Sequence, residues 1–309
     1  EKNLTEFTEF YLVGFQSSKL FIIFLFCFTL VIYFGTICGN LLIIVLVSTS
    51  RSLHTPMYFF ISQLSVTDIL LTTNIVPNML HVLLHNGGAI TFAGCMTQLY
   101  FFCASETFEC FLLTVMSYDR YLAICDPLRY TSIMTNTNCV KLGSASWLFG
   151  FFCAFLDTLT ILMLTFCGPN TIDHFFCDIV PLIEIACSGS DTVRLEIYIL
   201  SLPVLFIPIT IIVISYINII VTIIRLHSGM SRQKAFSTCS SHLIVVSIFY
   251  FTPLSVYVFP TGGQTLNISK ILSLLYTVFT PFINPIIYSL RNRDIAQSLQ
   301  DIITKIWNL

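Results

Sequence analysis

Long apolar runs, each almost free of charged residues, alternate with short polar segments along the chain. There are seven of them, at residues 20–50, 56–84, 93–118, 142–170, 197–224, 235–269 and 271–290. Each reaches the roughly 20 residues that a helix needs to cross the hydrocarbon core of a membrane. Short segments of alternating polar and apolar residues, which are typical of a transmembrane β-barrel, do not occur in the sequence. The pattern predicts an all-α membrane protein, a bundle of seven transmembrane helices.

The composition agrees with this prediction. Of the 309 residues, 56% are hydrophobic and 10% are charged, and the mean hydropathy is +0.87. Because a water-soluble domain carries about 25% charged residues, this chain could not cover a water-facing surface. The net charge of −2 argues against a nucleic-acid partner, which would leave a basic footprint. We expect one domain over residues 1–309, with an N-terminal segment at 1–19, spans and loops at 20–290 and a C-terminal segment at 291–309.

The C-terminal segment has its own pattern. Apolar residues recur there at helical spacing, at Ile295, Leu299, Ile302, Ile303 and Ile306, and Trp307 follows them. This spacing predicts an amphipathic helix that lies on the cytoplasmic membrane surface. The shortness of the segment, together with Asp301 and Lys305, argues against an eighth crossing.

The basic residues predict the orientation. Ten of the 14 lysines and arginines fall on one side of the predicted bundle: Arg51, Arg120, Arg129, Lys141, Arg225, Arg232, Lys234, Arg291, Arg293 and Lys305. Since short cytoplasmic loops are rich in Lys and Arg, this side is expected to be cytoplasmic and the N-terminus extracellular. The N-glycosylation sequons at Asn3 and Asn267 then fall on the extracellular side.

Four of the twelve cysteines are expected on the extracellular side: Cys95, Cys167, Cys177 and Cys187. An oxidising compartment favours disulfides, but four cysteines allow three pairings, and this count does not choose among them. Three of the four lie in the longest loop, at residues 166–197, which is therefore expected to be a folded lid. The other eight lie within spans or at their cytoplasmic ends, where cysteine behaves as a small hydrophobic residue.

Four long motifs narrow the interpretation. They are Leu53–Phe60 before the second span, Met116–Cys125 at the end of the third, Lys234–Leu243 entering the sixth and Pro281–Tyr288 in the seventh. Together they resemble the motifs of olfactory receptors of the tetrapod (class II) type, within the rhodopsin-like G-protein-coupled receptors. The resemblance implies a receptor rather than an enzyme, which binds a small volatile odorant and activates a stimulatory olfactory-type G protein, raising cAMP. It also implies a place in the plasma membrane, among membrane lipids, in the cilia of olfactory neurons.

The resemblance also implies roles for particular residues. It pairs Cys95 with Cys177, which leaves Cys167 with Cys187. It assigns activation and G-protein coupling to Asp119, Arg120, Tyr121, Tyr216, Lys234, His242, Asn284, Pro285 and Tyr288. An arginine held by its neighbouring carboxylate at rest can be released when helices shift, and then contacts a partner protein.

Two acidic residues are expected at similar depth in the membrane, Asp68 in the second span and Glu109 in the third. Ionisable groups inside a span are costly and mark functional sites by default. With Asn40 and Asn284 nearby, the two carboxylates are expected to hold Na⁺ as a structural or allosteric ion, and no cofactor is expected. The alternative is that one or both are protonated and only join helices by hydrogen bonds.

A ligand site is expected in the extracellular half of the bundle, since one face of the third span carries polar and aromatic side chains at helical spacing. The expected lining residues are Phe102, Cys103, Glu106, Thr107, Cys110, Ser201, Leu205, Tyr250, Tyr257 and Thr277. An apolar chamber with a few polar points is typical of small-molecule sites. Interhelical packing is the alternative for each residue taken alone.

Other classes of membrane protein fit the sequence less well. The halves of the chain do not resemble each other, as the repeats of many transporters do. The seventh span has no lysine for a retinal Schiff base. The motifs His-Glu-x-x-His and Gly-x-Ser-x-Gly, which would indicate a protease, are absent from the sequence.

Overall fold

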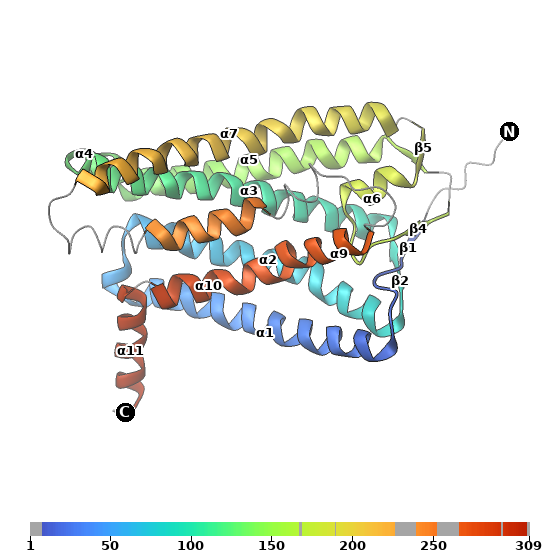
Figure 1. Ribbon diagram of the computed structural model, residues 1–309, viewed down its shortest axis with the longest axis horizontal. Coiled ribbons are helices and arrows are strands. Elements are labelled where there is room, and N and C mark those ends of the chain that lie inside the picture. Colours follow the sequence, from blue (N-terminus) through green and yellow to red (C-terminus); the bar gives the residue numbers. More distant parts are fainter. Residues whose placement is uncertain are drawn as a thin grey trace.

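The computed structural model describes residues 8–166, 169–188, 190–225, 239–251, 266–291 and 293–307. Its helices lie side by side along the long axis of the molecule (Figure 1). Six described helical stretches have the length and hydropathy to cross a membrane: Lys19–Thr49 (α1), Pro56–His85 (α2), Phe92–Cys125 (α3), Asn136–Leu162 (α5), Thr192–Arg225 within α7 (Ser190–Arg225), and Ser269–Ser289. A shorter apolar helix, Cys239–Phe251, lies in the sixth predicted run. The helical bundle that the sequence predicts is confirmed.

Local sequence signals set several helix ends. The Ser18 and Thr91 side chains accept hydrogen bonds from Phe21 and Gly94 and so cap α1 and α3. Pro56 opens α2, where its missing N–H costs nothing. The fourth span was predicted to reach residue 170, but α5 ends at Leu162. Apolar composition alone does not distinguish a helix from the short β3 strand that follows.

The last span is not one regular helix. It consists of α9 (Leu266–Leu274), the π-helical turn η2 (Leu275–Phe279) and α10 (Thr280–Arg291), which contains Pro285. The amphipathic helix predicted after it is present as α11 (Arg293–Trp307), and Ile295 is buried against the bundle. Figure 1 shows α11 turned away from the direction of the other helices. This is the arrangement of a helix that lies along a membrane surface.

One end of the bundle, here called the sheet end, is covered by short strands. The N-terminal strand β1 (Glu9–Leu12) lies between β2 (Gly88–Thr91), to which it is antiparallel, and β4 (Thr171–Ile172), to which it is parallel. In the loop after α5, β3 (Thr165–Phe166) pairs with β5 (Ala186–Ser188), and α6 (Ile179–Glu184) lies between them in sequence. The predicted folded lid is thus present, but the N-terminal segment was not expected to be part of it.

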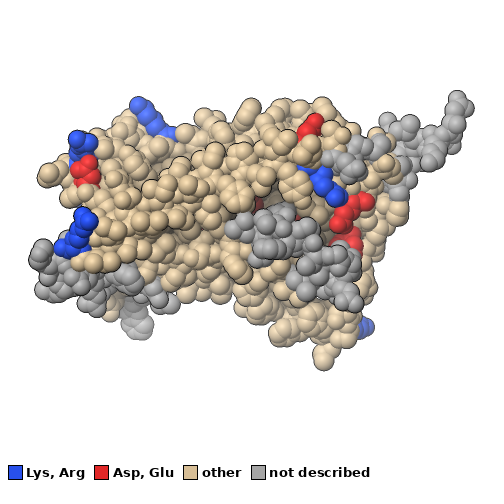
Figure 2. Space-filling view, turned by 45° about the horizontal axis from the view of Figure 1, so that its top comes forward, with Lys and Arg blue, Asp and Glu red and all other residues tan. Residues whose placement is uncertain are grey.

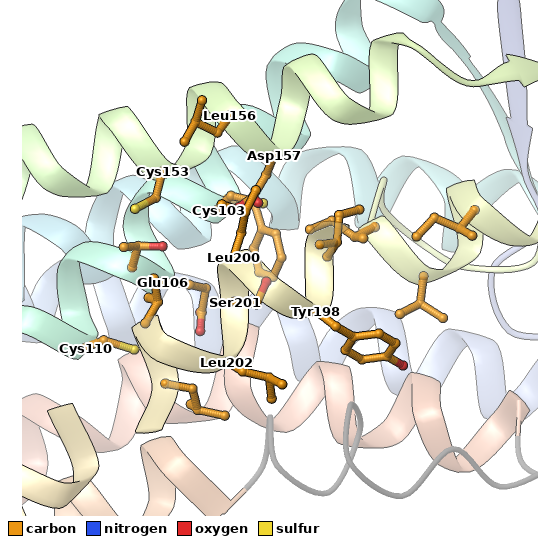
Figure 3. A pocket seen from close by; sticks show the side chains of 18 of the residues that line it. Cys103, Glu106, Cys110, Cys153, Leu156, Asp157, Tyr198, Leu200, Ser201 and Leu202 are labelled. Atoms are coloured by element: carbon orange, nitrogen blue, oxygen red, sulfur yellow. The ribbon is translucent and has the colours of Figure 1, made fainter. Parts of the chain in front are cut away.

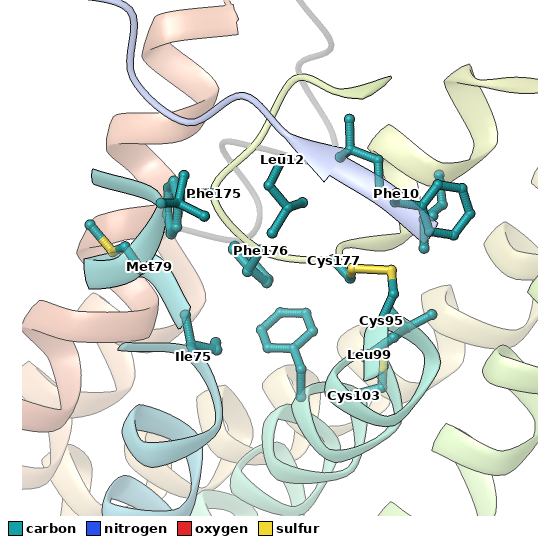
Figure 4. Packing of buried hydrophobic residues seen from close by; sticks show 14 of the residues in the cluster. Phe10, Leu12, Ile75, Met79, Cys95, Leu99, Cys103, Phe175, Phe176 and Cys177 are labelled. Atoms are coloured by element: carbon teal, nitrogen blue, oxygen red, sulfur yellow. A yellow bond between two sulfur atoms is a disulfide. The ribbon is translucent and has the colours of Figure 1, made fainter. Parts of the chain in front are cut away.

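The opposite end, here called the Arg120 end, carries η1 (Arg51–Leu53), α4 (Pro127–Ile133) and α11 (Figure 1). Two clusters of buried apolar side chains fill the interior, one toward each end. At the sheet end, Phe10 and Leu12 of β1 pack over Phe176 and the Cys95–Cys177 disulfide (Figure 4).

The outer surface fits a membrane. Lys, Arg, Asp and Glu gather toward the two ends of the face in Figure 2, and the belt between them is uncharged. Large apolar side chains point outward along this belt, among them Val31 of α1, Phe152 of α5 and Ile214 of α7, each at least half exposed. An exposed apolar surface of this extent is stable against lipid rather than water.

Candidate functional site

A chamber of about 620 Å³ lies between α3, α5, α6 and α7, in the half of the bundle nearer the sheet end (Figure 3). Phe249, from the helix Cys239–Phe251, and Tyr276, from η2, also line it. Helices α3 and α5 approach closely beside it, because Gly150 has no side chain: a Cβ there would lie 2.8 Å from the Ala104 carbonyl oxygen. The volume suits a ligand of modest size.

Seven of the ten residues predicted for the ligand site line this chamber: Phe102, Cys103, Glu106, Thr107, Cys110, Ser201 and Leu205. The five from α3 follow helical spacing, so they share the face that α3 turns toward α5 and α7. The structure therefore brings together the predicted α3 and α7 walls. That these residues bind a ligand remains a prediction.

Two predicted residues lie outside the chamber wall. Tyr250 is buried against Phe249, which takes its place in the lining. Thr277 is buried too, with its hydroxyl donating to the Ser273 carbonyl oxygen, while Tyr276 faces the chamber. A shift by one residue turns a side chain by about 100° around a helix, so small errors in register move it off a wall. Tyr257 lies outside the described residues.

Sequence reasoning missed the walls that α5 and α6 supply. Cys153, Leu156 and Asp157 of α5 line the chamber, as do Ile179 and Ile183 of α6. Asp157 is the one charged residue in the predicted fourth span. Because a charged residue within a span marks a functional site by default, the sequence alone could have indicated that Asp157 belongs to the site. The α6 wall comes from the loop and carried no such signal.

Three polar side chains of the chamber lack partners among the residues that the structure describes. Neither carboxylate, Glu106 on α3 or Asp157 on α5, forms an ion pair or hydrogen bond with the part of the chain that the structure describes. Thr107, 8% exposed, also makes no side-chain hydrogen bond within the described residues. The rest of the lining is mostly apolar or aromatic.

A separate polar core lies where the sequence predicts one. It consists of Asp68, Glu109, Asn40 and Asn284, all at most 2% exposed. The Asn284 amide donates to both Asp68 oxygens, at 3.1 and 3.2 Å, and Asp68 is in electrostatic range of Glu109. The Asn40 amide donates to the carbonyl oxygens of Thr36 and Pro281. The predicted convergence of α1, α2, α3 and α10 is therefore present.

The polar core contains buried oxygen atoms that accept no hydrogen bond and could bind a cation. Glu109 Oε1 and Asn40 Oδ1 are buried and accept no hydrogen bond. Carboxylate and amide oxygens are ligands of hard cations, so this donor set fits Na⁺. No group of three or more His, Cys, Asp or Glu side chains that could hold a metal ion occurs among the described residues.

At the Arg120 end, the guanidinium of Arg120 is held by its neighbour. Its Nε donates to Asp119 Oδ2 at 2.8 Å, and a terminal nitrogen pairs with the same oxygen. The Tyr130 hydroxyl of α4 donates to the other Asp119 oxygen at 2.9 Å. Burial, followed by the Asp119 charge, raises the pKa of Tyr130, so this donor stays protonated. The arrangement matches the resting pair that the sequence predicts.

A second contact joins the helices next to this pair. The Tyr216 hydroxyl of α7 lies 2.6 Å from Nδ1 of His242 in the helix Cys239–Phe251, and both side chains are buried. Tyr288 of α10 is also buried, and Tyr216 is within its electrostatic range. The predicted coupling residues Tyr121, Asn284 and Pro285 lie on α3 and α10, whereas Lys234 lies outside the described residues.

The sheet end is fastened over the bundle. The predicted Cys95–Cys177 disulfide is present, and the Cys177 N–H donates to the Gln98 side chain at 3.0 Å. The buried Lys270 ammonium donates to the Gly14 carbonyl oxygen at 2.8 Å and pairs with Asp173 at 2.6 Å, so it joins α9 to both the N-terminal segment and the loop.

Three predicted sites at this end stay predictions. Cys187 is disulfide-bonded, but its predicted partner Cys167 lies outside the described residues, as does Asn3. The Asn267 side chain also lies outside them.

A sequence model of the family described as "Olfactory receptor" matches residues 26–306. The chain belongs to the olfactory receptor family. Among similar relatives of this receptor, human Olfactory receptor 10A7 is 45% identical, with 98% of this chain and 96% of that protein covered. Mouse (Mus musculus) Olfactory receptor 5p57 is 42% identical, with 98% and 97% covered.

The receptor also shares its fold with a solved structure. Squid rhodopsin superposes with a TM-score of 0.71, covering 94% of this chain and 88% of that one, at 17% identity. This similarity shows the seven-transmembrane fold. With the family, it makes the protein a multi-pass membrane receptor that responds to odorants and couples to G proteins, and not an enzyme.

Proposed function

We propose that this olfactory receptor binds its odorant in the chamber between α3, α5, α6 and α7 and then activates a stimulatory olfactory-type G protein, which raises cAMP. The chamber is the observation that supports the proposal. It has the volume of a small-molecule site, mostly apolar walls and a few polar side chains. Shape and apolar contact would select the odorant, and the polar groups would orient it.

One short helix connects the chamber with the Arg120 end. Phe249 lines the chamber, and His242, two turns earlier on the same helix, contacts Tyr216 of α7. His242 is also in electrostatic range of Arg120. An odorant that displaces Phe249 would therefore move His242 and favour a packing in which Arg120 leaves Asp119. The freed arginine would contact the G protein.

The orientation follows from this assignment. The sheet end would face outside the cell, where a disulfide such as Cys95–Cys177 persists, and the Arg120 end would face the cytoplasm. The excess of basic residues on the side of Arg120 supports the same orientation. We place the receptor in the plasma membrane of olfactory cilia, with its N-terminus outside.

We further propose that the polar core binds Na⁺ and that sodium stabilises the resting packing. Glu109 Oε1 and Asn40 Oδ1 would supply ligands, beside the Asp68 carboxylate. A ligand shifts an equilibrium only through different affinities for two states, so sodium would have to be lost when the helices move.

Two substitutions test the proposed function in cells that express the receptor with the G protein. Phe249→Ala should shift the odorant response by about tenfold or more, whereas Phe251→Ala, on the same helix but 73% exposed, should not. Arg120→Ala should abolish the cAMP response while odorant still stabilises the purified receptor. A normal cAMP response of Arg120→Ala at matched surface expression would show that the coupling mechanism is wrong.

A further inference from the structure

Besides the exposed Glu184 of α6, the chamber carries two acidic side chains from different helices, and this inference rests on the proposed odorant site. Glu106 comes from α3 and Asp157 from α5, and Figure 3 shows both among the side chains that surround the chamber. The Cys103 sulfur is in electrostatic range of both carboxylates. The two acids therefore act on the same part of the chamber.

Within the described part of the chain, these carboxylates have none of the partners that an acid in a membrane span normally has. Intramembrane acids are paired or hydrogen-bonded in most proteins because an isolated charge is costly there. Among the described lining residues, the one with a positive charge is Arg194, whose exposed side chain lies on the first turns of α7. Neither acid forms an ion pair with it.

A third polar group points to a ligand with several donors. Thr107 is more than nine-tenths buried, lines the chamber next to Glu106 in sequence, and its hydroxyl makes no hydrogen bond within the described residues. Phe102, Phe249 and Tyr276 add aromatic rings to the same lining. Oxygen acceptors and aromatic faces are the groups that receive an ammonium ion, which has three donors.

We infer that the odorants of this receptor carry a basic nitrogen: small aliphatic or arylalkyl amines whose ammonium group pairs with Glu106, with Asp157 and Thr107 as further acceptors. Such amines are protonated at neutral pH, as the lysine side chain is. The carbon skeleton would lie against the apolar walls, for example Ile197 and Leu205.

Matched pairs of small molecules test this inference on the full-length receptor. The probes are butylamine, hexylamine, octylamine and benzylamine, each with the alcohol of the same skeleton. We expect at least one amine to activate the receptor at a concentration about tenfold or more below that of its alcohol, because a charge-assisted hydrogen bond replaces a neutral one. Glu106→Gln should remove this preference, because it should weaken the response to the amine about tenfold more than the response to the alcohol.

Further variants separate the charge from the fold. Glu106→Asp should retain part of the preference, and Asp157→Asn should reduce it less than Glu106→Gln does. Glu196→Gln, on the exposed surface of α7, is the matched control and should change nothing. If no amine acts better than its alcohol, or if Glu106→Gln weakens both to the same extent, the inference is wrong.

Binding measured without a G protein distinguishes this inference from the proposed function. Amines should raise the melting temperature of the purified receptor more than their alcohols do. Stabilisation by an amine without any cAMP response would retain the inference and contradict the proposed coupling. A cAMP response to alcohols, with no stabilisation by amines beyond theirs, would retain the function and overturn the inference.

Discussion

Helix α3 carries one glutamate into each of two regions of the bundle. Glu109 enters the polar core, and Glu106, one turn nearer the sheet end, faces the chamber. In the polar core the nearby Asp68 receives two hydrogen bonds from Asn284, whereas in the chamber neither Glu106 nor Asp157 receives one from the described residues. Glu106 and Glu109 have the same residue type and lie on the same helix, but they face these two different regions.

The difference lies in what the protein supplies around each acid. In the polar core, side chains from α2, α3 and α10 are packed tightly enough for an amide to reach a carboxylate. In the chamber, the helices stand apart around a space of about 620 Å³. In the polar core, a side chain of the receptor serves as the hydrogen-bond partner of an acid. In the chamber, we expect a bound ligand to serve as that partner. Removing an acid should therefore destabilise the ligand-free receptor in the polar core, and should have little effect on its stability, or stabilise it, in the chamber.

The largest effect is expected in the polar core. Asp68→Ala should destabilise the receptor by about 2–3 kcal/mol, because it leaves the buried Asn284 amide without its acceptor. Asp68→Asn, which keeps an acceptor oxygen, should cost less. Thermal unfolding of the purified, ligand-free receptor measures both. Equal stability of Asp68→Ala and wild type would mean that the core is not held by this hydrogen bond.

A buried group at the sheet end gives the next largest effect. His174 is 3% exposed, stacks on Phe175, and neither ring nitrogen has a hydrogen-bond partner within the described residues. Burial, followed by the nearby Lys270 charge, lowers the pKa of His174 from 6.5 to about 3. The opposing Asp173 carboxylate is paired with Lys270.

Because the folded-state pKa is below the unfolded one, protonation of His174 favours unfolding. Its contribution to stability is complete above about pH 6.5 and should fall by about 1.4 kcal/mol per pH unit below that, until pH 3. His174→Phe should remove this part of the acid sensitivity, which melting curves at pH 7 and pH 5.5 would show. An unchanged pH dependence in His174→Phe would contradict the assignment.

Sodium should act on one of the two acid pairs and not on the other. At a sodium concentration about four times its Kd, the ion should stabilise the wild type by about 1 kcal/mol. Glu106→Gln should keep this stabilisation, and Asp68→Asn should lose it. Melting curves in sodium and in choline buffers measure the difference. Loss of the sodium effect in Glu106→Gln alone would place the ion in the chamber.

The smallest effect is expected from the chamber acids. In the ligand-free receptor, Glu106→Gln and Asp157→Asn should change the free energy of unfolding by less than about 0.5 kcal/mol or stabilise the receptor, since neither acid has a partner among the described residues. Differential scanning calorimetry of these two variants and of Asp68→Ala would measure the difference in their unfolding. Destabilisation as large as that of Asp68→Ala would mean that these acids have structural partners.

The sequence predicted what depends on local pattern. Charge-free runs located the spans because a charge in lipid is costly, and helical spacing put five α3 residues on the chamber wall. It did not predict the π-helical turn Leu275–Phe279, which sits where Tyr276 rather than Thr277 faces the chamber. Nor did it predict β1, because strands of two to four residues carry too little periodicity and their partners lie far along the chain.

Those distant partners have a consequence for how the receptor is made. During synthesis, Phe10 leaves the ribosome well before its partner Ile90, and Tyr11 well before Thr171. The hydrogen bond to the Gly14 carbonyl oxygen forms later still, because its donor is Lys270 of the last span. Residues of the N-terminal segment are thus made early and reach their final contacts late. Completion of the sheet end over the chamber is therefore a late step in the synthesis of the chain, because it needs Lys270 of α9.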